Sequence, residues 1–311
     1  MEHFVTLFNS LFLPQGLALH MSMERHVREY VLWILCVDDE TYEVLGLLNL
    51  PNVRRLKLSD LETPELLEVK QGRTIGEYCW TLTPYAPRFV FEADSSVDRV
   101  TYIDADLWFR KHPKSIFDEL DASGKQVLIT DHAYAPEYDQ SATSGQFCVQ
   151  FMTFTRESGE LVRQWWEERC IEWCFARFED GKFGDQKYLD DWPERFGSLV
   201  HVLQNKELTL APWNAMRFPY ANAVFYHFHG LRILSRRQLW IGDYSLPLAL
   251  KQYVYKPYCD DLKEAIKQLE AIQFTWKPQA VIASFPRRVF RKIRRLYRLY
   301  QLLSPSGFTK W

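Results

Sequence analysis

The feature that most constrains the fold of this chain is an alternation, through its first half, of short apolar segments with longer segments of helical spacing. The apolar segments have the length and the branched or aromatic content of buried strands. Strands that alternate with helices form a mainly parallel sheet with helices on both faces, so we predict an α/β fold. The predicted strands are Phe4–Phe8, Tyr30–Val37, Val53–Leu58, Val100–Ile103, Val127–Thr130 and Phe147–Thr155.

The helices expected between these strands are Gly16–Val27, Thr41–Leu48 and Ile75–Glu92, the last interrupted by Pro84 and Pro87. The second half predicts a helix over Glu157–Phe175, another that begins at Gly184, and short strands at Val200–Leu203, Leu208–Ala211 and Ala223–Phe228. With 47% hydrophobic residues among 311, the chain can bury a large core, which excludes global disorder. The simplest division is one α/β domain, residues 1–276, followed by a basic tail, residues 277–311.

Two carboxylates follow the strand that ends at Ile103. Asp104 and Asp106 stand two residues apart, on either side of Ala105, where α/β sheets bind their ligands. Two such oxygens suit a hard divalent cation, Mg²⁺ or Mn²⁺, which can bridge to a diphosphate and stabilise it as a leaving group. The alternative is a strand-end turn with two solvated aspartates, and the Asp-x-Asp pattern alone leaves both open.

A histidine pair follows the last short strand. His227 could give a neutral imidazole to the same metal, and Gly230 would let the backbone approach a phosphate closely. Arg232 or Arg236 could form charge-assisted hydrogen bonds to that phosphate. The alternative is that His227 and His229 are a structural pair beside a turn.

A third polar segment starts at Gly184. A glycine followed by an aspartate is a plausible helix entry, with the carboxylate near the positive end of the helix. Asp185 and Gln186 would then project polar groups into a cleft. A capped amphipathic helix with no role in binding explains the same residues.

Together these segments resemble the retaining glycosyltransferases of family 8 and their bacterial relatives, which share the GT-A fold. Tyr102-Ile103-Asp104-Ala105-Asp106 is similar to that family's strand and Asp-x-Asp motif, and His227-Phe228-His229-Gly230 to its His-aromatic-x-Gly motif. Asp185-Gln186 is similar to its Asp-Gln pair, and Val5-Thr6-Leu7-Phe8-Asn9 to its first strand and loop. The resemblance spans roughly residues 4–240.

The resemblance implies a role for each matched residue. Asp104, Asp106 and His227 would hold the metal, and Asp185 and Gln186 would be the catalytic pair at the donor sugar. The residues implied to bind the nucleotide-diphosphate donor are Thr6, Phe8, Asn9, Asp104, Ala105, Gly230 and Arg232. The implied activity is metal-dependent transfer of a sugar, from UDP-hexose and with retention, to a saccharide or lipid-linked acceptor in polysaccharide or lipopolysaccharide biosynthesis.

The sequence departs from the family pattern at two places. Ile233 stands where the family usually has Lys, and the nearest cation, Arg232, lies one place earlier. Phe147-Cys148-Val149-Gln150 replaces an Asn-x-Gly in the middle strand. Ala211-Pro212-Trp213-Asn214 is similar to a segment of the bacterial relatives, and Trp213 fits either the acceptor cleft or the buried core.

Two other functions fit parts of the pattern. A haloacid-dehalogenase-type phosphatase also has Asp-x-Asp after an apolar strand, and Gly184-Asp185 could imitate its distal acidic motif. Against it, Trp108 stands where that class has Thr or Val, and no apolar strand precedes Gly184. The second alternative is a non-catalytic protein that binds sugars or a membrane surface, suggested by the aromatic content of 15% and by the basic tail.

The tail differs in charge from the rest of the chain. Seven of the 38 basic residues and no acidic residue lie within residues 286–300, so that 31 basic residues remain against 40 acidic ones. Apolar residues recur there at helical spacing, which predicts a C-terminal basic amphipathic helix that binds an anionic membrane surface through residues 287–303. The alternative is a terminal helix packed on the acidic body.

Composition also indicates a compartment. A net charge of −2 argues against a nucleic-acid partner. Six cysteines without a disulfide spacing, and a first segment unlike a signal peptide, predict a cytoplasmic protein. With the basic tail, the prediction extends to peripheral attachment at the inner face of the cell membrane.

Overall fold

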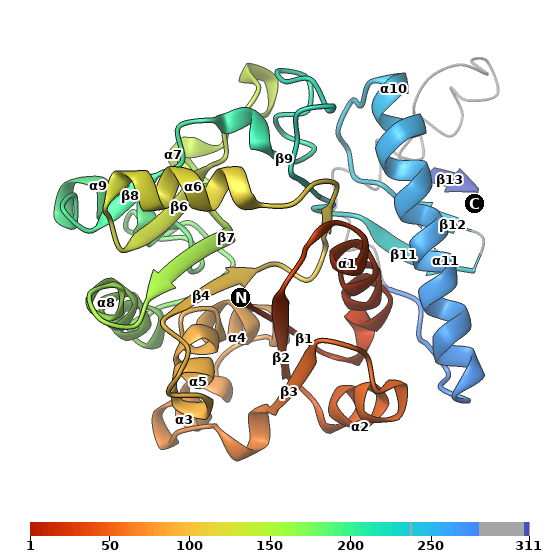
Figure 1. The fold of residues 1–311 in the computed structure, drawn as a ribbon, viewed down its shortest axis with the longest axis horizontal. Coiled ribbons are helices and arrows are strands. Elements are labelled where there is room, and N and C mark those ends of the chain that lie inside the picture. The colour runs from red at the N-terminus through yellow and green to blue at the C-terminus, as the bar shows by residue number, and fades with distance from the viewer. Residues whose placement is uncertain (237, 280–307, 311) are drawn as a thin grey trace.

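A seven-stranded sheet runs through the centre of the computed structural model, which describes residues 1–236, 238–279 and 308–310 (Figure 1). Its strands are β1 Glu2–Phe8, β2 Tyr30–Cys36, β3 Val53–Lys57, β4 Arg99–Ile103, β6 Val127–Asp131, β7 Phe147–Thr155 and β8 Val200–Val202. They lie in the order β3-β2-β1-β4-β7-β6-β8. β7 is antiparallel to β4 and β6, and the other neighbouring pairs are parallel, which confirms the predicted mainly parallel sheet.

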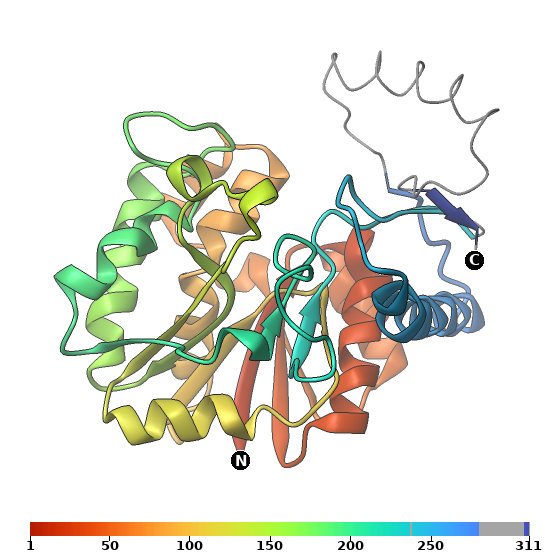
Figure 2. The ribbon, with the colours of Figure 1, turned by 90° about the horizontal axis from the view of Figure 1, so that it is seen from above.

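Helices cover both faces of this sheet, as the view in Figure 2 also shows. They are α1 Leu13–His26, α2 Asp39–Leu48, α3 Pro64–Lys70, α4 Ile75–Leu82, α5 Tyr85–Ala93, α6 Lys114–Ser123 and α8 Gly159–Glu172. Alternate residues of a strand face opposite ways, so Phe4 and Phe8 share a core with α1, α2 and α6, whereas Val5 and Leu7 share one with α3, α4 and α5. Since both faces are covered, β2 is buried along its whole length.

The helical region around Pro84 and Pro87 is interrupted once rather than twice. The break falls at Thr83–Pro84, between α4 and α5. Pro87 lies in the first turn of α5, where a backbone N–H has no partner inside the helix, so its missing donor costs nothing. The expectation that Pro87 also breaks the helix is therefore wrong.

The segment after Gly184 is a turn and not the start of a long helix. Gly184 has φ +53° and packs on Trp80, whose ring lies 3.2 Å from where a Cβ would stand. This left-handed backbone conformation favours glycine and is not helical, so a regular helix does not begin at Gly184. Only a 3₁₀ helix, Lys187–Asp191, and one turn of helix, α9 Trp192–Arg195, follow. Asp185 and Gln186 lie in the turn itself.

Two small sheets complete the second half of the chain. One has the order β5-β10-β9, with β5 Leu107–Phe109, β10 Phe225–His227 and β9 Thr209–Leu210. The other has the order β11-β12-β13, with β11 Arg232–Ser235, β12 Gln238–Trp240 and β13 Phe308–Lys310. The remaining α-helices are α7 Ser141–Ser144, α10 Leu248–Leu250 and α11 Lys256–Ala271, which packs on α1 and follows a π-helical turn, Lys251–Tyr255. Short 3₁₀ helices lie at Ser10–Phe12, Leu58–Asp60, Pro136–Tyr138 and Lys206–Leu208.

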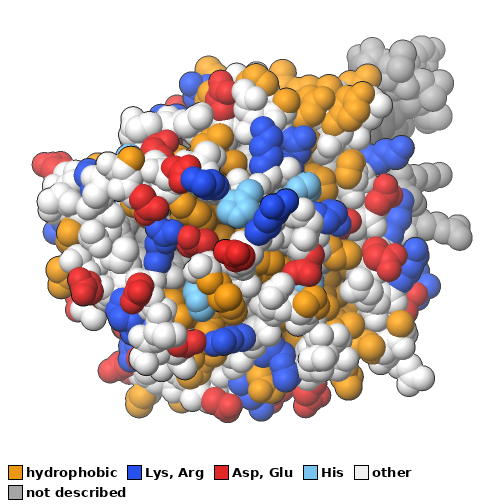
Figure 3. All heavy atoms as spheres, viewed as in Figure 1, with side chains coloured by type: hydrophobic (Ala, Val, Ile, Leu, Met, Phe, Trp, Pro, Cys, Tyr) orange, Lys and Arg blue, Asp and Glu red, His pale blue; other side chains and the backbone are white. Residues whose placement is uncertain are grey.

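The predicted amphipathic helix in residues 287–303 lies outside the described residues. In the part of the chain that is described, no helix is both long and apolar enough to cross a membrane. On the face that Figure 3 shows, acidic and basic side chains are interspersed over most of the surface.

Candidate active site

A cavity of about 590 Å³ opens at the carboxyl ends of β1 and β4, where ligands bind in sheets of this kind. The loop after β1, the segment after β4 and the turn at Gly184 form parts of its wall. Most of the residues predicted to act line it, namely Phe8, Asn9, Asp104, Ala105, Asp106, Asp185, Gln186, His227 and Arg232.

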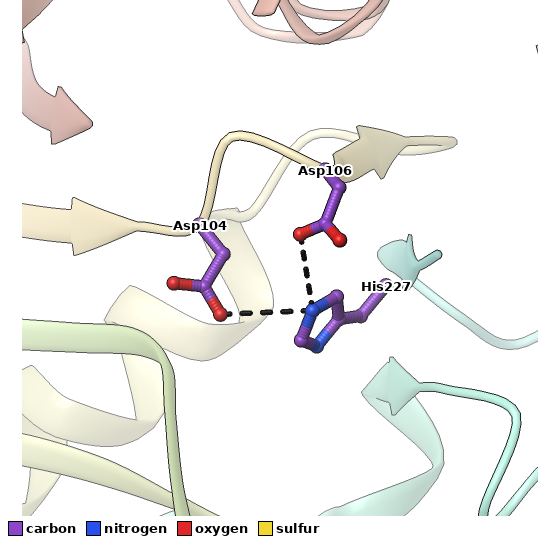
Figure 4. Close-up of side chains that lie close together, drawn as sticks. All are labelled: Asp104, Asp106 and His227. Atoms are coloured by element: carbon purple, nitrogen blue, oxygen red, sulfur yellow. Dashed lines mark ion pairs between the residues drawn. The ribbon is translucent and has the colours of Figure 1, made fainter. Parts of the chain in front are cut away.

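Asp104, Asp106 and His227 meet in the wall of this cavity (Figure 4). The Nε2 atom of His227 lies 3.1 Å from Oδ1 of Asp106 and 3.6 Å from Oδ2 of Asp104. The other oxygen of Asp104 accepts a hydrogen bond of 3.0 Å from the Tyr102 hydroxyl. The structure thus brings together the three residues that the sequence predicts to converge.

Strand pairing explains why they meet. β10 pairs antiparallel with β5, which places His227 opposite Leu107, and the backbone N–H of Phe228 donates to the carbonyl of Asp106. The turn between β4 and β5 closes through a bond of 3.1 Å from Leu107 N to the carbonyl of Asp104. Both carboxylates are therefore held beside the end of β10.

The electrostatics of the cluster favour a positive charge between the carboxylates. Burial raises the pKa of Asp104 to about 6. Burial opposes the charged form of Asp106 as well, but the charge and hydrogen bond of His227 outweigh it and lower the pKa of Asp106 to about 2. Likewise, burial alone would lower the pKa of His227, whereas the two aspartates raise it well above its usual value.

The donor set fits a divalent cation. One atom from each of Asp104, Asp106 and His227 lies within 4.8 Å of the others, a spacing that one ion with bonds of about 2.0–2.6 Å can bridge. Carboxylate oxygens with one imidazole nitrogen suit Mn²⁺ or Mg²⁺ better than a soft metal.

Asp185 lines the cavity and has one carboxylate oxygen without a partner in the described part of the chain. Its side chain is buried, and its Oδ2 atom has no hydrogen-bond partner among the described residues. Burial raises its pKa to about 7, and the charge of Asp104 adds to this. The neighbouring Gln186 is anchored, because its Nε2 donates to the carbonyl of Ser144 at 2.7 Å.

Arg232 is the one arginine or lysine among the described residues that line the cavity. Its guanidinium lies 5.7 Å from the ring centroid of Phe12, and Ile233 beside it is fully buried in the core. Arg236 instead pairs with Glu270 and does not line the cavity. Of the two arginines that the sequence left open, Arg232 is therefore the one that a bound phosphate could reach.

Two predicted donor-binding residues lie apart from the cavity wall. Thr6 is fully buried within β1, and Gly230, with φ +76°, forms the turn between His227 and Arg232. Neither lines the cavity. Gly230 lets the chain reverse, so that His227 and Arg232 can both reach the wall.

Three aromatic side chains, His132, Tyr134 and Trp213, form another side of the cavity. Of these, only Trp213 was expected from the sequence to lie near a cleft. His132 stacks on Tyr134 at 4.6 Å, and the indole N–H of Trp213 donates to the carbonyl of His132 at 2.9 Å. Trp213 is buried and also lines the cavity, with its ring 5.3 Å from that of His227. Trp213 is therefore part of the buried core and of the cavity wall at once.

Comparison with known proteins identifies relatives of this chain. No family model matches it. It is 30% identical over 294 residues to the uncharacterized protein YfnD of Bacillus subtilis, covering 86% of this chain and 91% of YfnD. It is also 30% identical over 247 residues to YfnF of the same organism, covering 73% and 80%. The chain belongs to the YfnD family.

Solved structures similar to this YfnD-family protein are glycosyltransferases. The galactosyltransferase LgtC, in complex with donor and acceptor sugar analogs, is 15% identical with a TM-score of 0.52, covering 84% of this chain and 95% of LgtC. The apo form of the glycosyltransferase GlyE of Streptococcus pneumoniae is 13% identical with a TM-score of 0.53, covering 90% and 66%. The YfnD-family protein therefore has the GT-A fold of these glycosyltransferases.

Proposed function

We propose that this protein is a metal-dependent glycosyltransferase that takes a sugar from a nucleotide-diphosphate sugar. The observation that carries the proposal is the Asp104–Asp106–His227 cluster in the wall of a large cavity at the carboxyl ends of β1 and β4. The GT-A fold supports it, because open α/β sheets bind their ligands at that edge.

The nucleotide-diphosphate would lie between the loop after β1 and the cluster. Phe8 offers a ring and Asn9 an amide to a base and ribose on that side of the cavity. Arg232 would form charge-assisted hydrogen bonds to the diphosphate. Mn²⁺ or Mg²⁺, held by the three residues of the cluster, would neutralise charge on the leaving diphosphate. UDP-hexose is the proposed donor, from the family resemblance.

The donor sugar would lie beside Asp185 and Gln186. The unpartnered oxygen of Asp185 can accept a hydrogen bond from a sugar hydroxyl, which would end its unsatisfied state. Gln186 would stabilise the reacting carbon on the face opposite the diphosphate, consistent with retention.

The acceptor would be a saccharide or a lipid-linked sugar. The aromatic wall of His132, Tyr134 and Trp213 offers apolar ring faces, which pack well on the C–H faces of sugar rings. Burial lowers the pKa of His132 to about 3, so this wall stays uncharged at neutral pH. Such acceptors belong to polysaccharide or lipopolysaccharide biosynthesis.

Removal of a metal ligand tests the proposal. Asp106→Ala and His227→Ala each remove a donor atom, so Mn²⁺-dependent turnover of UDP-hexoses is expected to fall by about 10²-fold or more. Circular dichroism should show that both variants are folded. Asp118→Ala is the matched control, because this carboxylate is 56% exposed and pairs with Lys114 on α6. If EDTA leaves sugar transfer by the wild-type protein unchanged, the metal-dependent mechanism is ruled out.

Two further measurements separate the alternatives. A thermal-shift panel of UDP-, GDP-, CMP- and dTDP-sugars with Mn²⁺ identifies the donor, since a ligand of the native state raises the unfolding temperature. Release of phosphate from simple phosphomonoesters would point to the phosphatase instead. A non-catalytic sugar- or membrane-binding protein would turn over no donor with any metal.

A further inference from the structure

Gln150, in the middle of β7, contacts both segments that carry the metal-binding side chains. Its Oε1 lies 2.9 Å from Nδ1 of His227, and its backbone carbonyl accepts a hydrogen bond of 3.1 Å from the N–H of Asp104. The side chain is fully buried. Gln150 therefore links the end of β4 to the end of β10, in addition to the pairing of β5 with β10.

In the neutral form of His227 that can bind a metal, the contact decides which ring nitrogen carries the proton. A neutral imidazole has one N–H, and only the nitrogen without it can bind a metal. Nε2 is the nitrogen that faces Asp106 and Asp104. Since an amide oxygen only accepts hydrogen bonds, Oε1 of Gln150 takes the N–H of Nδ1 and leaves the lone pair of Nε2 for an ion.

Packing alone does not explain a glutamine at this position. The Nε2 of Gln150 is buried and has no hydrogen-bond partner among the described residues, which destabilises the fold. A methionine would fill a similar volume without that cost. A function for the oxygen of the same amide accounts for a glutamine at this position.

We infer that Gln150 is a positioning residue that fixes the tautomer and the ring orientation of His227 for metal binding. The inference rests on the proposed function, because it requires that the cluster of Asp104, Asp106 and His227 holds a divalent ion. The neutral amide does this without adding a third negative charge beside two carboxylates. Partners of this kind usually change metal affinity by about 10- to 100-fold when they are removed.

The test measures the affinity of the full-length, metal-free protein for Mn²⁺, by the loss of the free-ion EPR signal. Gln150→Met removes the acceptor and is expected to weaken binding by about 10- to 100-fold. Gln150→Asn keeps the amide but shortens its arm by one methylene, and the same loss is expected. Gln150→Glu keeps an oxygen acceptor at the same reach and should restore wild-type affinity or exceed it.

Thr153→Val is the matched control on the same strand. It removes a buried hydrogen bond of 3.0 Å between the hydroxyls of Thr153 on β7 and Thr101 on β4. Stability should fall, while Mn²⁺ affinity stays at the wild-type value.

A second readout reports the tautomer itself. In the Mg²⁺-loaded wild-type protein with ¹⁵N-labelled histidine, NMR should show His227 protonated at Nδ1, and Gln150→Met should show a mixture. Equal Mn²⁺ affinity of wild type, Gln150→Met and Gln150→Asn would overturn the inference and leave the proposed function intact. Equal affinity of wild type and His227→Ala, or no binding by either, would overturn the metal site and the inference with it.

Discussion

The turn that carries Asp185 and Gln186 shows how single residues are prepared for a ligand. The indole N–H of Trp166 donates to the backbone carbonyl of Asp185 at 2.8 Å, and the amide of Gln186 is tied to Ser144. The backbone is thus fixed, yet one oxygen of Asp185 stays without a partner. A buried polar atom that is left unpaired in a well-anchored turn is best explained by a ligand that pairs with it.

Gln186→Ala should separate transition-state stabilisation from substrate binding. Because the amide is held rigidly by Ser144, its contribution is to positioning, so kcat is expected to fall by about 10-fold or more with a smaller rise in KM. Steady-state kinetics with the donor found in the thermal-shift panel measures this. Gln204→Ala, at an exposed glutamine, is the control. A KM effect alone would assign Gln186 to binding, and NMR of an inverted product would contradict retention.

Local sequence patterns found the site residues that follow strands and turns, and missed those that depend on pairing over long distances. Asp104 and Asp106 directly follow an apolar strand, so their place at the sheet edge could be predicted. Gln150 lies in a strand that is buried along its length, and its partner His227 is 77 residues away. Its role exists only once β7 and β10 are placed, so no local signal reveals it.

At the scale of elements, the central strands could be predicted because they are buried. Several other strands could not be predicted because they are short. β2 and β7 are buried on both faces, and their observed bounds agree with the predicted bounds to within one residue. β5, β11 and β12 have only three or four residues each, and distant partners decide their pairing. The residues by which α4 lines the cavity, including Trp80, were not predicted as site residues, because only the packing of α4 against the turn at Gly184 brings them there.

The start of α2 is expected to stabilise both the fold and the loop after β1. Asp38 caps this helix by accepting a hydrogen bond of 2.8 Å from Thr41 N. It also accepts hydrogen bonds from the backbone N–H and the hydroxyl of Ser10, in the loop after β1. Asp38→Ala is expected to lower the free energy of unfolding by about 1–2 kcal/mol. Urea unfolding measures it. Asp39→Ala, at an exposed residue paired with Lys57, is the control and should change little.

The contribution of Asp38 to the free energy of unfolding should depend on pH. Burial raises the pKa of this carboxyl, but hydrogen bonds from Thr41 and Ser10 outweigh burial and lower the pKa below its usual value. A lowered pKa stabilises the fold above the unfolded pKa, near about 3.9, and the gain is lost as pH falls through the folded pKa. The difference between wild type and Asp38→Ala should therefore be constant near neutral pH and shrink below about pH 4. A difference that does not shrink as the pH falls below about 4 would contradict this assignment.

At the scale of the whole molecule, the C-terminal part of the chain returns to the loop after β1, which lines one side of the cavity. After α11, which lies beside α1 (Figure 1), Gln279 is buried between two segments of the N-terminal and C-terminal halves. Its amide donates to the carbonyl of Leu11 at 3.0 Å and accepts from Ile233 N at 3.0 Å. These two bonds connect the segment just before Phe12 to the strand that carries Arg232, so this side of the cavity depends on contacts that no single motif contains.

The basic tail remains a prediction, because residues 287–303 lie outside the described residues. Its seven basic residues could each contribute about 1 kcal/mol at an anionic surface, enough for reversible attachment near a lipid-linked acceptor. Such attachment should weaken as salt rises, since the surface field is screened within about one Debye length. The wild-type chain should therefore co-sediment with phosphatidylserine vesicles at low salt and be released at high salt.

Charge substitutions in the full chain test whether the tail or the body binds. A variant with Arg291, Arg294, Arg295 and Arg298 changed to Ser is expected to lose co-sedimentation while it keeps donor turnover on a soluble acceptor. The matched control changes Lys114, Lys263 and Lys267, which already pair with acidic neighbours on α6 and α11, and should bind like wild type. If all three proteins bind anionic vesicles equally, the body carries the contact. If none binds at low salt, the basic tail does not bind membranes. Packing of its apolar stripe against the acidic body then becomes the better explanation of its sequence pattern.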